Sequence, residues 1–396
     1  MPARQQRRAL FAFRAVACAY FAYAGLFGAY APLWFQSMGY STLAIGILAS
    51  MQSATRVIGP YAWGWLADHT GRRTTMLRIA ASLSLVCSIG FLDSTSSGWV
   101  ATVMVALFLC TAGVIPIHEA ALAHLVTTGG KFDVTRYGRV RVWGSVGFMF
   151  AVTAGGYVLQ ALGIRLFPGL VILLLGFLMV ATLRLPVIVE PPHPTEGMAG
   201  ALRVLRQPVV AWFFLGTFLT VLAHAALYMF LSLYLVSLGY GKGAVGLVWV
   251  VGVAIEVGWF WFQGRWLHRL SMHAWLVLAA LMTALRFAAT AAFGGTAWIL
   301  VLAQCTHAFT FVAQHSACIA VINRHFPGTL RGRGQALYAV LGYGASGVVG
   351  GIAGGALSEW LGFGSVFWAA SVVALLAALC SWRALVLERR GPSLLP

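Results

Sequence analysis

The sequence is short of charge, and above all of negative charge. Only 9% of its 396 residues are charged, and it contains nine Asp or Glu residues against 26 Lys or Arg. Soluble domains have about 25% charged residues. The hydrophobic fraction of 60% and the mean hydropathy of +0.86 therefore exclude an ordinary soluble protein.

The sequence also lacks the motifs of several functional classes. It has no G-x-x-x-x-G-K-[ST] phosphate loop, which argues against transport energised by ATP. The cysteines occur singly in apolar stretches, without the paired spacing of a metal site or a disulfide framework. They are Cys18, Cys87, Cys110, Cys305, Cys318 and Cys380. We see no nucleophile with a matching base, so we expect no enzyme, no metal site and no cofactor.

Long apolar runs dominate the chain instead. A helix needs about 20 apolar residues to cross a hydrocarbon core of about 30 Å. We count twelve such runs, near residues 14–36, 43–67, 74–92, 98–126, 140–162, 167–186, 209–237, 243–267, 273–293, 296–323, 335–358 and 364–385. The sequence therefore predicts an all-α, polytopic membrane protein with 12 transmembrane helices and no soluble domain.

The positive charge is distributed unevenly between the two sides of these spans. At the N-terminus, at the C-terminus, and in or at the edge of alternate connections lie 22 of the 26 Lys and Arg residues. The opposite connections contain Arg165 and Lys242, while Arg56 and Arg286 lie inside spans. This asymmetry predicts that both termini are cytoplasmic. We therefore attribute the net charge of +17 to membrane topology and expect a lipid bilayer, not nucleic acid, as the partner.

The chain contains an internal repeat with an offset of about 200 residues. Residues 33–40 match residues 233–240, and residues 118–123 match residues 315–320. The repeat predicts two six-helix pseudo-repeats. We place the N-terminal half at 1–186, a polar, Pro-rich cytoplasmic linker at 187–208 and the C-terminal half at 209–396. Transporters are often built from such parallel halves, with the substrate site at mid-membrane.

Residues 64–73, with the sequence GWLADHTGRR, lie between the second and third spans. The pattern G-x-L-A-D-x-x-G-R-R resembles the most specific motif of the major facilitator superfamily. Its matching positions are Gly64, Leu66, Asp68, Gly71, Arg72 and Arg73. The stretches 137–145, 224–256 and 304–315 further resemble the phenylpropionate-permease-like branch of proton symporters, which is similar to lactose permease. The resemblance implies a monomeric permease of the bacterial inner membrane.

The loop at residues 64–73 is a candidate gate. An acid at the end of a helix can accept hydrogen bonds from a helix N-terminus or an arginine, and such a pair can hold one transport state closed. We expect Asp68, Arg72 and Arg73 to form this latch. Gly64 and Gly71 would allow the tight turn. The alternative is a helix-ending turn whose arginines only set topology.

Two acids lie inside predicted spans, Glu119 in the fourth and Glu256 in the eighth. A charge at the bilayer centre costs at least about 2.5 kcal/mol, so such acids face a cavity and have partners. The resemblance to lactose permease implies that Glu119 and Arg141 contact substrate. It also implies that Glu256, Arg286 and His307 carry the proton relay.

One departure from lactose permease leaves the acid that carries the proton open. Lactose permease has a second acid after its histidine in span 10, whereas Thr310 and Phe311 follow His307 here. The proton-bearing acid is therefore Glu119 or Glu256. For Arg56, a structural charge pair and a transport role are equally compatible with the sequence.

Histidines and aromatic residues complete the predicted substrate site. His118, His224 and His315 can bind substrate or relay a proton. Tyr23 and Tyr228 lie on spans that line the cavity of the superfamily, although such aromatic stripes also serve as packing. We expect a proton-coupled importer of a small organic solute, first an aromatic carboxylate such as a phenylpropanoid. A sugar or nucleoside symporter and a proton-driven exporter are the alternatives; the absence of proline from span 5 disfavours export.

Overall fold

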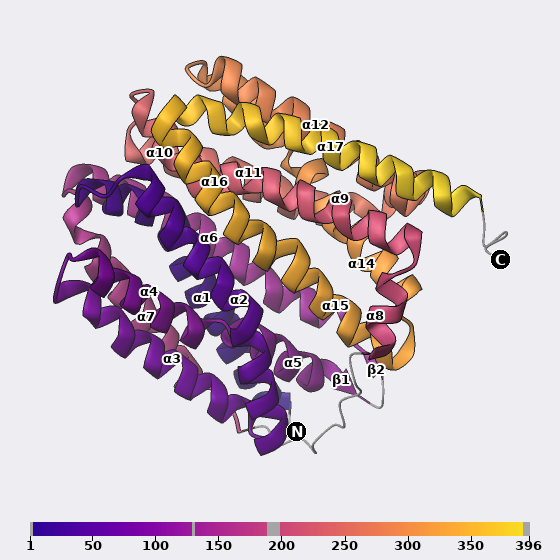
Figure 1. Ribbon diagram of the computed structural model, residues 1–396. Coiled ribbons are helices and arrows are strands. Elements are labelled where there is room, and N and C mark those ends of the chain that lie inside the picture. The colour runs from indigo at the N-terminus through magenta and orange to yellow at the C-terminus, as the bar shows by residue number, and fades with distance from the viewer. Residues whose placement is uncertain (1–2, 129–130, 188–198, 391–396) are drawn as a thin grey trace. The chain divides into compact units, whose positions relative to one another are not determined.

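The computed structural model describes residues 3–128, 131–187 and 199–390, and nearly all of them are helical (Figure 1). Eleven helices in this part of the chain are long and apolar enough to cross a membrane. Helix α2 (Thr42–Thr70) has 29 residues but is not among the eleven. Its middle contains the polar residues Ser50, Gln52, Ser53 and Arg56. The predicted spans thus correspond to these eleven helices and α2.

The first half of the sequence forms helices joined by short turns. They are α1 (Ala3–Ser37), α2, α3 (Arg73–Ile89) with η1 (Gly90–Leu92), α4 (Ser97–Thr111), α5 (Val114–Val126), α6 (Val134–Ala161), η2 (Ile164–Leu166) and α7 (Phe167–Leu183). Strands β1 (Thr127–Thr128) and β2 (Lys131–Phe132) pair antiparallel between α5 and α6. Asp133 then starts α6 as its N-cap, because its side chain accepts a hydrogen bond from the amide of Arg136.

The second half has the same plan with more irregular helices. Its elements are α8 (Ala199–Leu205), α9 (Pro208–Ala225), η3 (Ala226–Phe230), α10 (Leu231–Ser237), α11 (Lys242–Phe262), η4 (Gln263–Arg265), η5 (Leu267–Arg269), α12 (Met272–Phe293), α13 (Ala297–Cys305), η6 (Ala308–Ala313), α14 (Gln314–His325), η7 (Gly328–Leu330), α15 (Arg331–Leu337), η8 (Tyr338–Ala345), α16 (Ser346–Leu361) and α17 (Phe363–Arg389). The segments η3, η6 and η8 are π-helical turns inside longer helices. Such turns occur frequently at functional sites.

Packing groups these helices into two compact units. Unit 1 comprises residues 1–40, 54–194 and 240–250, and unit 2 comprises residues 41–53, 195–239 and 251–396. Each unit therefore contains the first part of one helix from the other half of the sequence, namely α2 in unit 2 and α11 in unit 1. The division into halves at 187–208 stays a prediction, and residues 188–198 of this linker lie outside the described residues.

The sequence repeat is visible in the local backbone. Gly39 has φ 85° and Gly239 has φ 90°, so both occupy the left-handed region where glycine is favoured. Two residues before each glycine, the hydroxyls of Ser37 and Ser237 donate to the carbonyl three residues earlier, at 2.7 Å in both cases. The first and seventh spans therefore end in the same turn.

Close helix packing at two equivalent glycines brings the exchanged helix ends against their neighbours. In unit 2, a Cβ at Gly46 of α2 would clash with the carbonyl oxygen of Gly351 on α16. In unit 1, a Cβ at Gly246 of α11 would lie 2.6 Å from the hydroxyl of Tyr30 and 2.7 Å from the carbonyl oxygen of Val152. Small residues at helix crossings allow such close approach in membrane proteins.

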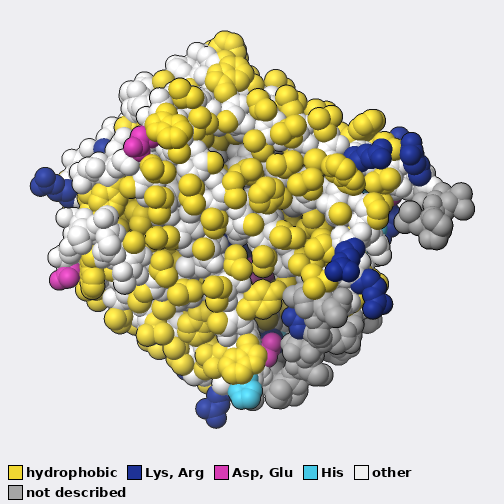
Figure 2. Space-filling view, viewed as in Figure 1, with side chains coloured by type: hydrophobic (Ala, Val, Ile, Leu, Met, Phe, Trp, Pro, Cys, Tyr) yellow, Lys and Arg dark blue, Asp and Glu magenta, His cyan; other side chains and the backbone are white. Residues whose placement is uncertain are grey.

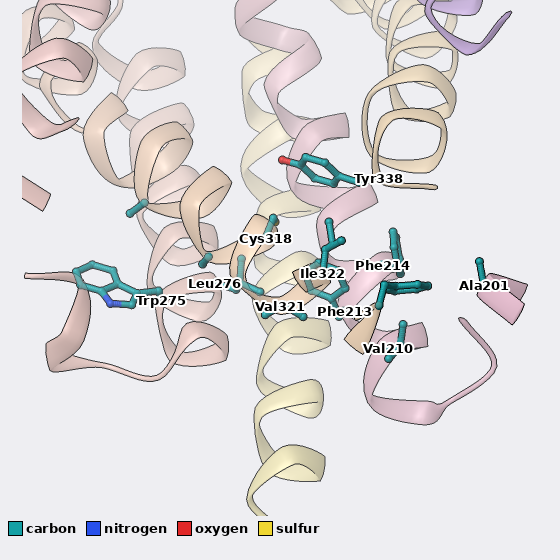
Figure 3. Packing of buried hydrophobic residues seen from close by; sticks show 13 residues of the cluster. Ala201, Val210, Phe213, Phe214, Trp275, Leu276, Cys318, Val321, Ile322 and Tyr338 are labelled. Carbon is teal, nitrogen blue, oxygen red and sulfur yellow. The ribbon is translucent and has the colours of Figure 1, made fainter. Parts of the chain in front are cut away.

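The interior of unit 2 contains an apolar cluster between α9, α12, α14 and η8 (Figure 3). Its members include Phe213, Phe214, Leu276, Ile322 and Tyr338, all buried. Helix α17 packs along α12 and α9 on the same unit. Figure 2 shows mainly hydrophobic side chains on the visible face, with the few Lys and Arg residues toward its edges. Such a surface suits a protein surrounded by lipid.

Candidate functional site

In unit 1, an acid–arginine pair joins helix α5 to helix α6. Arg141 Nε lies 2.8 Å from Glu119 Oε1, and the hydroxyl of Tyr137 donates to Glu119 Oε2. Tyr137 and Arg141 are four residues apart and share one face of α6. The exposed fractions of the side chains are 29% for Glu119 and 41% for Arg141. The two residues predicted to contact substrate thus lie together, and their charges balance each other.

An aromatic ring on α1 holds the guanidinium of this pair. Arg141 Cζ lies 4.6 Å from the ring centroid of Phe21, a distance typical of a cation–π contact. One turn further along α6, a Cβ at Gly144 would lie 2.7 Å from the Phe21 ring and 3.2 Å from Arg141 Nη1. The glycine therefore leaves room for the arginine between the two helices.

Of the other residues discussed in unit 1, His118 and Tyr23 are buried and Arg56 is exposed. His118 is buried, and its Nε2 lies 3.0 Å from the carbonyl oxygen of Phe13, so this nitrogen is the protonated one. The buried Tyr23 ring contacts the Tyr20 ring edge-to-face, with centroids 6.2 Å apart. Arg56 is exposed and forms no ion pair with a described carboxylate.

In unit 2, Arg286 on α12 lies at the centre of a buried polar cluster. Its side chain is only 1% exposed. Nη1 donates to His307 Nδ1 and to Thr310 Oγ1, both at 2.9 Å, and Nη2 donates to Gln304 Oε1 at 2.6 Å. No carboxylate among the described residues forms an ion pair with this guanidinium. The cluster therefore holds a buried positive charge among acceptors that are neutral.

The hydrogen bond from Arg286 fixes the tautomer of His307. An arginine is always a donor, so His307 Nδ1 must be the acceptor and Nε2 must carry the proton. His307 Nε2 lies 3.9 Å from Glu256 Oε2, which is too long for a direct hydrogen bond. The three residues predicted for the proton relay therefore form a chain from Glu256 through His307 to Arg286.

Helix geometry explains why these acceptors converge on one arginine. Gln304, His307 and Thr310 follow each other at intervals of three residues, which places them on one helical face. The π-helical turn η6 begins directly after His307. On the other side, Gly252 leaves space for the cluster, because a Cβ there would lie 3.3 Å from Gln304 Oε1.

His224 and Tyr228 lie beside this cluster on α9 and η3. His224 is 3% exposed, its Nδ1 lies 2.8 Å from the carbonyl oxygen of Thr220, and its Nε2 is buried without a hydrogen-bond partner among the described residues. The His224 ring lies 5.4 Å from the Phe287 ring and stacks on Tyr228 at 6.2 Å. Because Nδ1 faces a carbonyl, Nε2 is a bare acceptor in the neutral ring.

His315 continues a column of rings along the tenth span. The rings of His307 and Phe311 stack at 5.1 Å, and those of Phe311 and His315 stack at 6.1 Å. His315 Nδ1 lies 3.1 Å from the hydroxyl of Tyr338, which is 3.2 Å from the hydroxyl of Tyr343. The predicted histidine is therefore connected to the relay by aromatic stacking.

The predicted gating residues form the end of α2 and the turn to α3. Arg73 Nη2 donates to Asp68 Oδ1 at 3.3 Å, which is an ion pair within the loop itself. Gly71 has φ 61°, the left-handed conformation that the tight turn requires. Arg72 precedes the first residue of α3, and the Cβ position of Gly64 faces open space. The role of this loop as a latch stays a prediction.

The comparison with known families decides the class of the protein. The sequence profile of the MFS_1 like family matches residues 13–369. The chain belongs to this family. The MFS_1-like protein is therefore a multi-pass membrane protein and a secondary transporter of small molecules, not an enzyme. This confirms the predicted superfamily and the predicted helical membrane fold.

Individual relatives agree with this assignment. The chain is 29% identical to the "Probable 3-phenylpropionic acid transporter" of Escherichia coli (strain K12), over 91% of this chain and 95% of that protein. It is 25% identical to the maltose permease of Geobacillus stearothermophilus, over 91% of this chain and 90% of that one. The crystal structure of the nucleoside transporter NupG has the same fold, with a TM-score of 0.83 and 16% identity, covering 95% of this chain and 99% of that one.

Sequence reasoning missed four residues that touch the predicted site residues. They are Phe21 and Tyr137 beside the Glu119–Arg141 pair, and Gln304 and Thr310 around Arg286. Helical spacing could have found three of them. Tyr137 precedes Arg141 by four residues, and Gln304 and Thr310 lie three residues on either side of His307. No comparable signal points to Phe21, which lies on another helix.

Proposed function

We propose that this MFS_1-like protein is a proton-coupled symporter that imports a small organic solute. It works as a monomer in the bacterial inner membrane, with both termini in the cytoplasm, and uses the proton gradient instead of a cofactor. The observation that carries this proposal is the chain of Glu256, His307 and Arg286 in unit 2. It contains an acid that can take up and release a proton, next to groups that respond to its charge.

In the proposed mechanism, Glu256 is the acid that carries the proton. Both carboxylate oxygens of Glu119 are engaged by Arg141 and Tyr137, so protonation there would break a formed contact. Glu256 lies 3.9 Å from His307, too far for a direct hydrogen bond, so protonating Glu256 breaks no hydrogen bond to that histidine. Protonating Glu256 removes a negative charge near His307 and Arg286 and favours the arrival of an anion.

The solute that we favour is an aromatic carboxylate. This choice is supported by the relative in Escherichia coli, which is named for 3-phenylpropionic acid. It is also supported by the buried guanidinium of Arg286 and by the aromatic side chains near it. A sugar is the second candidate, because the maltose permease relative aligns over a similar share of the chain.

Uptake into proteoliposomes tests this proposal. The panel contains 3-phenylpropionate, maltose and a nucleoside, each with and without an inward proton gradient. We expect the gradient to drive accumulation of 3-phenylpropionate. The double variant Glu119→Gln, Glu256→Gln should lose this accumulation. Uptake that does not respond to the gradient, or full coupling in the double variant, would contradict proton symport, and gradient-driven extrusion would indicate an exporter.

A further inference from the structure

Arg141 belongs to the predicted substrate-binding pair and Arg286 to the predicted proton relay. The two arginines differ in how their positive charge is balanced. Arg141 pairs with Glu119 at 2.8 Å and is 41% exposed, so both a carboxylate and solvent can compensate its charge. Arg286 is 1% exposed and donates to an imidazole, a hydroxyl and an amide oxygen. A buried charge without a counter-ion is costly, and a bound anion relieves that cost.

Arg286 also retains hydrogen-bonding capacity. A guanidinium has five N–H donors in a planar fork that matches the two oxygens of a carboxylate. The three hydrogen bonds to described residues use three of these donors and leave two. An anion at Arg286 can therefore be bound without first breaking the contacts that orient the arginine.

The surroundings of Arg286 suit an aromatic ligand with a polar end. Arg286 Cζ lies 5.7 Å from the ring centroid of Phe287, which in turn packs against His224. Tyr228 stacks on His224 and is 37% exposed, while Phe311 stacks on His307 and is half-buried. Phe287 is itself buried, at 1% exposed, so the ring faces available to a ligand are those of Tyr228 and Phe311. His224 Nε2, which has no hydrogen-bond partner among the described residues, offers an acceptor.

We propose that Arg286, and not Arg141, binds the carboxylate of the substrate, with the aromatic part of the substrate against Tyr228 and Phe311. This inference rests on the proposed function and deepens it, because it names the group that recognises the anion. It also revises the assignment by resemblance, in which Arg141 holds substrate and Arg286 only takes part in the proton relay. In the first unit, Glu119 already occupies the position that a substrate carboxylate would need.

Equilibrium binding with a charged and a neutral ligand of the same shape tests the inference. We would measure binding of radiolabelled 3-phenylpropionate to the purified full-length protein, and its displacement by unlabelled 3-phenylpropionate or 3-phenylpropanamide. The wild type should prefer the acid over the amide by at least tenfold. Arg286→Gln should abolish this preference, and Arg141→Gln should retain it. Arg165→Gln, which removes an exposed arginine, is the matched control and should behave like the wild type.

A thermal measurement separates loss of binding from loss of folding. Ligand-free Arg286→Gln should still unfold in one cooperative transition, although it loses three buried hydrogen bonds along with the buried charge. Added 3-phenylpropionate should raise the unfolding temperature of the wild type and of Arg141→Gln, but not that of Arg286→Gln. Arg286→Lys keeps the charge without the fork and should retain part of the preference for the acid.

The possible outcomes distinguish this inference from the proposed function. An acid preference that survives in Arg286→Gln, or disappears in Arg141→Gln alone, overturns the inference while gradient-driven uptake of the acid still supports the symporter. A wild-type protein that binds maltose or a nucleoside tenfold better than 3-phenylpropionate overturns both the inference and the aromatic carboxylate. Proton coupling is then judged separately by the uptake assay.

Discussion

The two units of this transporter have opposite ways of balancing an arginine charge. In unit 1, Glu119 and Arg141 form a direct ion pair that is partly exposed. In unit 2, Arg286 is buried among neutral acceptors, and the nearest acid of its chain, Glu256, contacts His307 at 3.9 Å. A pair that is already neutral is suited to holding helices together. A buried charge without a paired acid is suited to binding an anion and responding to a proton.

The backbone and helix packing around these charged residues differ much less between the two units than the charges do. Gly39 and Gly239 make the same turn, and Gly46 and Gly246 occupy equivalent tight packing positions. Divergence is therefore concentrated in the polar side chains of the spans, and in the π-helical turns η3, η6 and η8 of the second half. The repeated helical scaffold thus carries different polar chemistry in each of its two copies.

The largest effect is expected from giving Arg286 a paired acid, because no described carboxylate forms an ion pair with it. Gln304 Oε1 lies 2.6 Å from Arg286 Nη2, so Gln304→Glu places a carboxylate there with almost no change in shape. We expect gradient-driven uptake of 3-phenylpropionate to fall about 100-fold, equivalent to about 2.7 kcal/mol. The unfolding temperature of the ligand-free protein should rise, because a paired buried charge is less costly.

Gln160→Glu is the control for this substitution. Gln160 Oε1 accepts a hydrogen bond from the amide of Gly243 at 2.9 Å, and a carboxylate would do the same. Uptake in this control should stay near the wild-type rate. Normal uptake in Gln304→Glu would show that transport does not need an unpaired Arg286.

A smaller effect is expected when the pair in unit 1 is opened. Glu119→Gln or Arg141→Gln alone should slow uptake about tenfold, because each leaves one charge without its partner. The double variant should be no worse than either single one, since residues in direct contact are not additive. Initial uptake rates of the three variants form the cycle. A loss of about 100-fold in the double variant would mean that the two side chains act independently.

Matched glycine substitutions test whether the helix packing is equivalent in the two units. Gly46→Ala and Gly246→Ala should each destabilise the protein by about 1–3 kcal/mol, because the new methyl group meets packed backbone or a tyrosine hydroxyl. Gly258→Ala, which has no atom within 4 Å of the new Cβ, should be neutral. Thermal unfolding in detergent measures all three. Destabilisation at only one of the two packed glycines would refute their equivalence.

The smallest expected effect lies in the loops that differ between the halves. Asp68 is 38% exposed, and an ion pair of this kind contributes about 1 kcal/mol or less. Asp68→Asn should therefore slow uptake measurably, by up to about fivefold, and leave membrane insertion intact. His268→Asn, in the copy of the loop that has no acid, should change nothing. Unchanged kinetics in Asp68→Asn would exclude a latch.

Much of the fold could be predicted from the sequence because the bilayer imposes simple rules on it. Apolar runs located the spans, and the repeated turn at residues 33–40 and 233–240 is confirmed by its backbone geometry. Helix α2 was the weakest case, since its polar side chains reduce its apolar character. The exchange of helix ends between the units could not be predicted, because it depends on glycine contacts between distant segments.

The site was predictable in its charged residues but not in its charge balance. Rare intramembrane acids and arginines identified Glu119, Arg141, Glu256 and Arg286 from the sequence alone. Whether an arginine pairs with an acid depends on the relative rotation of separate helices, which periodicity does not give. That His307, Gln304 and Thr310 all accept hydrogen bonds from Arg286, which pairs with no described acid, became visible only in three dimensions.

The central claim is that the coupled proton binds to Glu256 in unit 2 and not to Glu119 in unit 1. Its most direct test compares Glu256→Gln with Glu119→Gln in proteoliposomes loaded with 3-phenylpropionate or driven by an inward proton gradient. We predict that Glu256→Gln still exchanges 3-phenylpropionate across the membrane but no longer accumulates it, while Glu119→Gln accumulates it more slowly to the wild-type level. Accumulation that survives in Glu256→Gln and disappears in Glu119→Gln would contradict the account.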